Sequence, residues 1–90
     1  MQFRVRGEYW RLRFSIRLRK FWGLCCHNDK EIKLYSKMRP RKELTIECHE
    51  FGHAFFPDAD EQVIEQFGND LSEYLWKRGY RRWPKRADET

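Results

Sequence analysis

The chain has 90 residues, of which 40% are hydrophobic and 37% are charged, and its formal net charge is +5. This length predicts one small domain, and no apolar run approaches the roughly 20 residues of a membrane-spanning helix, which excludes such a helix. The first residues also lack the apolar segment of a secretory signal, so we expect a cytoplasmic protein.

The charge is distributed unevenly along the chain. Residues 1–42 contain 13 Lys and Arg against 3 acidic residues, whereas residues 43–76 contain 9 acidic residues and no Lys or Arg. Residues 77–90 are basic again, with 6 Lys and Arg against 2 acidic residues. An acidic segment between basic ends indicates attraction between segments, and it indicates that the acidic part itself holds a cation.

The cysteines are Cys25, Cys26 and Cys48. An odd number of cysteines with two of them adjacent is not the pattern of a disulfide framework, so we expect reduced thiols. Adjacent cysteines do not readily bind a single tetrahedral zinc, so we expect buried thiols here and no second metal site.

Alternating residues near the N-terminus predict a β-hairpin. Phe3 and Val5 alternate with polar residues, and after a turn at Gly7-Glu8 a longer alternating run extends from Tyr9 to Leu18. This period of two predicts two strands with one apolar and one basic face. Residues 31–35 alternate in the same way and predict a third strand, with residues 21–29 as the connection.

The second half of the chain has helical spacing. Apolar residues recur every three or four positions from Pro40 to about Phe56, and Pro57 ends that helix. Asp58 and Glu61 fit a capping box, with Asp58 as the N-cap of a second helix that runs to about Lys77. We therefore predict an α+β domain over residues 1–83, with a small antiparallel sheet (the hairpin plus the third strand) on two antiparallel helices. We expect residues 84–90 to be a disordered tail.

The first helix carries a motif with a specific chemistry. His49, Glu50 and His53 form the pattern H-E-x-x-H, and residues four apart in a helix lie on the same face. Both imidazoles can then bind one Zn²⁺, while Glu50 accepts a proton from water that the metal acidifies. A surface helix can carry this pattern by chance, but the apolar spacing predicts a helix here independently.

A catalytic zinc needs a third protein ligand, and the second helix offers two glutamates. Because the helices are joined by a short connection, they run antiparallel, which places Glu61 opposite His53 and Glu65 opposite His49. The capping box already explains Glu61, so we favour Glu65 as the third metal ligand over Glu61. Either one is also suited to support an imidazole from behind.

Most of the chain resembles a family of minimal zincins with a gluzincin layout, small proteins from phages and bacteria. The resemblance rests on His49-Glu50-x-x-His53-Ala54, Pro57-Asp58-Ala59-Asp60-Glu61-x-x-Ile64-Glu65, Asp70-Leu71 and Leu75-Trp76-x-x-Gly79-Tyr80. It implies a zinc metallopeptidase in which a small antiparallel sheet packs on two helices. It also implies His49 and His53 as ligands, Glu50 as catalytic acid and base, and a glutamate of the following helix as third ligand.

The substrate is expected to be a peptide or protein. In larger zincins the strand beside the active helix binds an extended substrate by edge pairing, and residues 32–35 are the segment suited to this role. Four side chains are candidates to stabilise an oxyanion, and their spacing selects none of them: His27, Tyr35, Tyr74 and Tyr80.

Two alternatives remain open. The first is a zinc-stabilised module without catalytic turnover. The second is nucleic-acid binding, alone or with peptidase activity, through a basic sheet face with interleaved aromatic residues. That face would contain Arg4, Arg6, Arg11, Arg13, Arg17, Arg19 and Lys20. The sequence does not select an oligomeric state.

Overall fold

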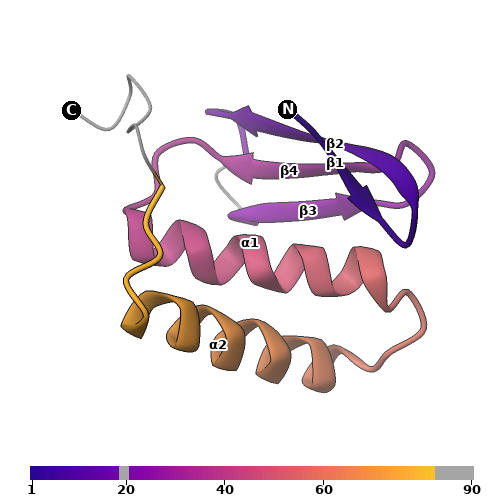
Figure 1. Cartoon of the computed structure of the whole chain (residues 1–90). Coiled ribbons are helices and arrows are strands. Elements are labelled where there is room, and N and C mark those ends of the chain that lie inside the picture. Colours follow the sequence, from indigo (N-terminus) through magenta and orange to yellow (C-terminus); the bar gives the residue numbers. More distant parts are fainter. Residues whose placement is uncertain (19–20, 83–90) are drawn as a thin grey trace.

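A computed structural model describes residues 1–18 and 21–82 and shows three layers, in which a sheet lies on α1 and α1 lies on α2 (Figure 1). The elements in chain order are β1 (Gln2–Val5), β2 (Glu8–Ser15), β3 (Gly23–Cys26), β4 (Glu31–Tyr35), α1 (Pro40–Phe55) and α2 (Glu61–Lys77). The predicted α+β class is therefore confirmed. α1 ends one residue before its predicted end, and α2 begins two residues later than the predicted N-cap at Asp58 implies.

The sheet is mixed, with the strand order β1-β2-β4-β3. β1 and β2 form the predicted antiparallel hairpin, and Arg6 and Gly7 between them have φ angles of 51° and 84°. Positive φ at both central residues is the requirement of the tight turn whose twist matches two antiparallel strands. The hairpin thus depends on Gly7, where positive φ causes no steric conflict.

The purely antiparallel sheet of three strands that the sequence predicts is wrong in two respects. Residues 23–26, which were assigned to a connection, form β3, and β2 pairs with β4 in parallel. β3 precedes β4 in the chain and pairs with it in antiparallel orientation, on the side of β4 away from β2. As a result β4 is an inner strand, and residues 32–35 do not offer the free edge that was expected of them; β3 lies at that edge of the sheet.

One face of the sheet packs on α1 and forms the core. Leu12 of β2 pairs with Ile32 of β4, and Ile32 pairs with Cys25 of β3, so apolar side chains of three strands share this face. The largest core cluster contains Val5, Trp10, Leu12, Ile32, Leu34, Met38 and Ala54. The opposite face is covered by neither α1 nor α2, which both lie on the apolar side (Figure 1).

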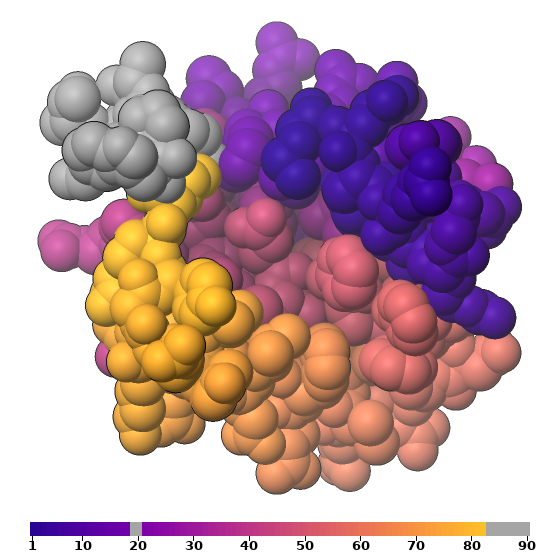
Figure 2. Space-filling model, viewed as in Figure 1, coloured from indigo at the N-terminus to yellow at the C-terminus, as the bar shows by residue number. Residues whose placement is uncertain are grey.

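α1 is the middle layer, and its side chains fill the space between the strands and α2 (Figure 2). Close packing of the two helices depends on Gly68, because a Cβ atom there would lie 2.9 Å from the Cα and backbone N of His49. Ile64, one turn earlier on α2, is fully buried. The position of α2 relative to the H-E-x-x-H motif is therefore set by a backbone contact.

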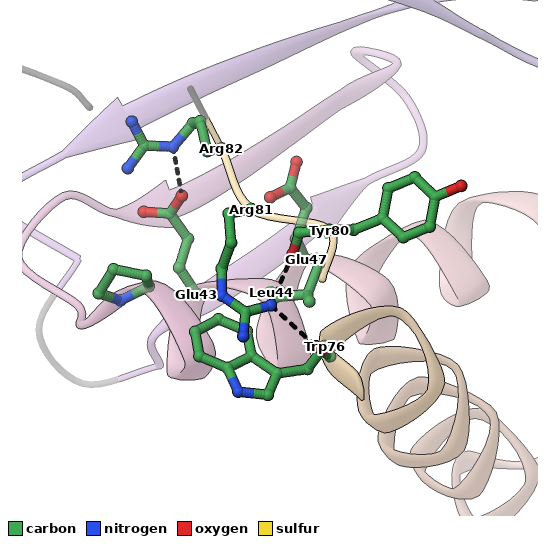
Figure 3. Close-up of a pocket in the computed structure, with 8 residues that line it drawn as sticks. Glu43, Leu44, Glu47, Trp76, Tyr80, Arg81 and Arg82 are labelled. Carbon is green, nitrogen blue, oxygen red and sulfur yellow. Dashed lines mark hydrogen bonds and ion pairs between the residues drawn. The ribbon is translucent and has the colours of Figure 1, made fainter. Parts of the chain in front are cut away.

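The segment after α2 returns along the N-terminal half of α1 and forms a small pocket there (Figure 3). Arg82 Nε donates a hydrogen bond of 3.1 Å to the carboxylate of Glu43, and the Arg81 guanidinium lies 3.4 Å from the centroid of the Trp76 ring. The predicted tail at 84–90 and the predicted domain end at residue 83 lie outside the described residues.

Candidate metal centre

Three side chains converge where α1 faces the beginning of α2. Nε2 of His49 lies 3.0 Å from Oε1 of Glu61, and Nε2 of His53 lies 2.9 Å from Oε2 of the same carboxylate. The two Nε2 atoms are 3.2 Å apart. His49, His53 and Glu61 therefore form a group that could hold a metal ion.

The local sequence explains this convergence. The two histidines are four residues apart in α1 and so lie on one face of the helix. α2 begins at Glu61 after a short connection, and the contact between Gly68 and His49 brings the helices close together. A glutamate in the first turn of α2 then reaches both imidazoles, while its own side chain stays 64% exposed.

The sequence-based preference for Glu65 does not agree with this geometry. Glu65 is exposed and does not belong to the group, whereas Glu61 contacts both imidazoles. The preference rested on a capping box that does not form, since the N-cap of α2 is Asp60, without a side-chain cap bond, and Asp58 does not cap it. Glu61 is thus not engaged in a capping box, and it lies two helical turns before Gly68 on the side that faces α1.

The distances suit a tetrahedral metal. In a tetrahedral site with bonds of about 2.0–2.1 Å, two ligand atoms lie about 3.3–3.4 Å apart. The three observed separations of 2.9 to 3.2 Å fall slightly below that value. Without a metal, the two contacts to Glu61 are satisfied if each imidazole donates its Nε2 proton to one carboxylate oxygen, although the two Nε2 atoms then cannot bond to each other. Metal content is therefore the decisive measurement.

Glu50, the middle residue of the motif, is buried, with only 8% of its surface exposed. Burial raises the pKa of its carboxyl, and the neighbouring imidazoles of His49 and His53 offset only part of this rise. Among the described residues, two other buried glutamates have cationic partners, namely Glu31 with Arg11 and Glu43 with Arg82. The structure gives Glu50 no such ion pair within its described part.

β3 covers Glu50 from the sheet side. A Cβ atom at Gly23 would lie 3.0 Å from Cγ of Glu50 and 2.7 Å from the side chain of Ile46, so only glycine lets the strand approach this closely. Cys25 of the same strand lies close enough to Glu50 for the charge of the Glu50 carboxylate to affect the pKa of the Cys25 thiol. Burial first, and the Glu50 carboxylate second, raise the pKa of the Cys25 thiol to about 12.

No pattern in the sequence predicts that Gly23 and Cys25 lie next to the candidate metal centre. Gly23 was interpreted as a chain breaker, and β3 is too short to show a clear alternation. Their spacing from β4 is set by the turn between the strands, which the sequence pattern does not reveal.

His27 is the one oxyanion candidate that contacts a residue of the centre. Its Nε2 donates a hydrogen bond of 2.9 Å to the backbone oxygen of His53, and its ring packs edge-on against Trp10. Tyr35 packs against Trp22, Tyr80 lines the pocket at the other end of α1, and Tyr74 is 60% exposed. His27 therefore ties the end of β3 to the end of α1 beside the motif.

The chain shows no significant match to a protein-family model, to a curated protein or to a solved structure. Neither helix in the described part is long and apolar enough to cross a membrane.

Proposed function

We propose that this chain is a zinc-dependent hydrolase that cleaves peptide bonds, with His49, His53 and Glu61 as metal ligands. The observation that carries the proposal is the convergence of the two Nε2 atoms and the Glu61 carboxylate within 2.9 to 3.2 Å. Two imidazoles and one carboxylate are a ligand set of catalytic zinc, which keeps its fourth position open. The sequence resemblance to minimal zincins agrees with this assignment.

The residues have distinct tasks. A bound zinc ion supplies Lewis acidity, which acidifies water and polarises a carbonyl group. Glu50 accepts the proton from water as general base and delivers it to the leaving amine as general acid, because a raised pKa suits a group that must both take and release a proton near neutral pH. His27 holds the backbone of His53 and so orients one ligand.

β3 supports a peptide as the substrate class. This strand lies at an edge of the sheet, pairs with β4 in the described part of the chain, and approaches Glu50 at Gly23. An extended peptide that pairs with its outer side would run beside the general base. In this proposal β3 takes over the role that the sequence analysis assigned to residues 32–35.

Metal content tests the ligand set. Protein purified without added zinc should contain about one zinc per chain. Glu61→Ala should lose most of it, whereas the matched variant Glu65→Ala should retain it. Zinc lost from Glu65→Ala and kept by Glu61→Ala would reverse the ligand assignment.

Hydrolysis of a broad peptide library tests the reaction. Wild-type protein should cleave peptides, and Glu50→Gln should keep its zinc and lose about 10²-fold or more of the activity. Unchanged activity in Glu50→Gln would remove Glu50 from the mechanism. Zinc binding without cleavage of any peptide by the wild type would identify the centre as structural, which is the alternative without turnover.

A further inference from the structure

The open face of the sheet, opposite the metal centre, is strongly basic. Side chains of alternate residues on β1, β2 and β4 point to this face, as the strand register shows. Its charged residues are Arg4, Arg11, Arg13 and Lys33 against a single acid, Glu31. Because neither α1 nor α2 covers this face, the cations meet solvent.

Glu31 organises three of these cations without neutralising them. Its carboxylate is 96% buried in the middle of the face and lies 3.4 Å from Arg11, 3.5 Å from Arg13 and 3.7 Å from Lys33. The three cationic side chains remain 55%, 64% and 40% exposed. One acid thus fixes the positions of three exposed cations, and a net positive charge remains for a partner.

An exposed aromatic ring lies at one end of this basic array. Tyr9 is 58% exposed, and the Arg4 guanidinium lies 4.8 Å from its ring centroid and donates a hydrogen bond of 2.8 Å to its hydroxyl. At the other end, Tyr35 is half-buried against the core and packs edge-on against Trp22, whose ring lies 5.1 Å from Nζ of Lys42 on α1. We therefore count only Tyr9 as an exposed ring of this face.

We propose that this face binds single-stranded nucleic acid. The cations supply contacts to successive phosphates, and the exposed ring of Tyr9 supplies a flat surface on which an unpaired base stacks. A sheet face with both features is a known way to bind unpaired bases, whereas a duplex offers its phosphates but keeps its bases stacked. The binding face lies on the other side of the sheet from His49, His53 and Glu61, so binding is independent of the metal.

Fluorescence anisotropy with a short labelled single strand of mixed sequence, as RNA and as DNA, tests this proposal. The double variant Arg4→Gln, Arg13→Gln should bind about tenfold or more weakly. The slope of log affinity against log salt should fall by about 0.7 for each phosphate contact removed. Glu31 keeps Arg11 and Lys33 as partners in this variant, and circular dichroism verifies the fold.

The matched control is Arg39→Gln, Arg78→Gln, which removes the same charge at exposed positions outside the sheet. It should bind like the wild type, and an equal loss in both double variants would overturn the proposal by showing that net charge alone is responsible.

The aromatic part is tested separately. Tyr9→Leu should weaken binding of the single strand about fivefold or more, while binding of the corresponding duplex should hardly change. Wild-type affinity should also persist in EDTA, which separates this surface from the proposed hydrolase. A wild type that binds the duplex as tightly as the single strand would contradict the assignment, as would full affinity in Tyr9→Leu.

Discussion

Two buried glutamates on α1, Glu43 and Glu50, have contrasting environments. They are seven residues apart on one side of the helix, with 4% and 8% of their surfaces exposed. Glu43 accepts a hydrogen bond from the Arg82 guanidinium. Glu50 has instead two imidazoles, a thiol and the backbone of β3 as neighbours, and the described residues provide it with no Lys or Arg.

The contrast separates a structural carboxylate from a reactive one. A cation beside a buried carboxylate offsets the cost of burying its charge, so such a pair serves the fold. A buried carboxylate without a cation is unfavourable for folding, and such groups occur preferentially where chemistry requires them. This contrast supports the proposed role of Glu50 as the reactive group, whereas Glu43 joins the C-terminal segment to α1.

The largest expected effect that tests the difference between Glu43 and Glu50 is a loss of stability. Glu43→Ala should lower the free energy of unfolding by about 2–3 kcal/mol, because it removes the carboxylate that pairs with the half-buried guanidinium of Arg82. This loss is at the lower end of the range for removing one partner of a buried ion pair, because 31% of the Arg82 side chain is exposed. Urea denaturation measures it, and the metal content should not change.

Glu50→Gln in metal-free protein is the matched comparison. It replaces a buried carboxyl group, whose charged form burial disfavours, by a neutral amide of the same shape, so the free energy of unfolding should stay within about 1 kcal/mol of the wild type or rise. If Glu50→Gln proved as destabilising as Glu43→Ala, the two glutamates would have the same role and the distinction would fail.

An effect of intermediate size is expected for Gly68, which lies against His49 at the candidate metal centre. Gly68→Ala should lower the free energy of unfolding by about 1–3 kcal/mol, because the added methyl group meets the backbone of His49, which has no freedom to move aside. Zinc affinity should fall with it, as α2 moves away and takes Glu61 along. Thermal denaturation and zinc titration provide the two measurements.

Gly52→Ala is the control for Gly68→Ala. Its added methyl group would lie 3.0 Å from the ring of Phe67, a side chain that is able to shift. Alanine also favours the helix by about 1 kcal/mol over glycine, so stability should change by less than about 1 kcal/mol. Equal losses in the two variants would show that the backbone contact at His49 has no special importance.

The smallest effect concerns an exposed carboxylate that has a cation. The Lys30 ammonium lies 2.6 Å from Glu8 and, through its hydrogen bond and charge, holds the pKa of Glu8 below 4.5. A lowered folded-state pKa means that the stabilisation is present above pH 4.5 and disappears as the pH falls through the folded-state value. Lys30→Gln should therefore be slightly less stable than the wild type at pH 7 and equal to it at the acid end of a denaturation series. A difference that persists in acid would assign the effect to something other than Glu8.

The helices and the motif were predictable because their signals are local. Pro40 and Pro57 limit α1, and apolar residues at three- and four-residue spacing indicate its buried side. Given that helix, the shared face of His49 and His53 follows from geometry alone. The hairpin of β1 and β2 was equally accessible, since Gly7 marks the turn between two alternating runs.

The remaining features depend on pairing between distant segments. No local pattern states that β2 pairs with β4 in parallel or that Gly23 lies against Glu50, because both follow from how the sheet closes over α1. The preference for Glu65 over Glu61 rested on the capping box expected from Asp58 and Glu61. The N-cap of α2 is Asp60, two residues later, so this box does not form and Glu61 contacts the histidines instead.

The three candidate metal ligands all lie within residues 49–61, and this placement has a consequence for the order of folding. They belong to one helical hairpin, whose contacts are close in sequence and therefore form quickly, whereas the parallel strands must first close a longer loop. Zinc bound by the helical hairpin early in folding would hold the two helices together while the strands are still unpaired. The ion would then stabilise a folding intermediate and would also serve the proposed catalysis in the folded protein.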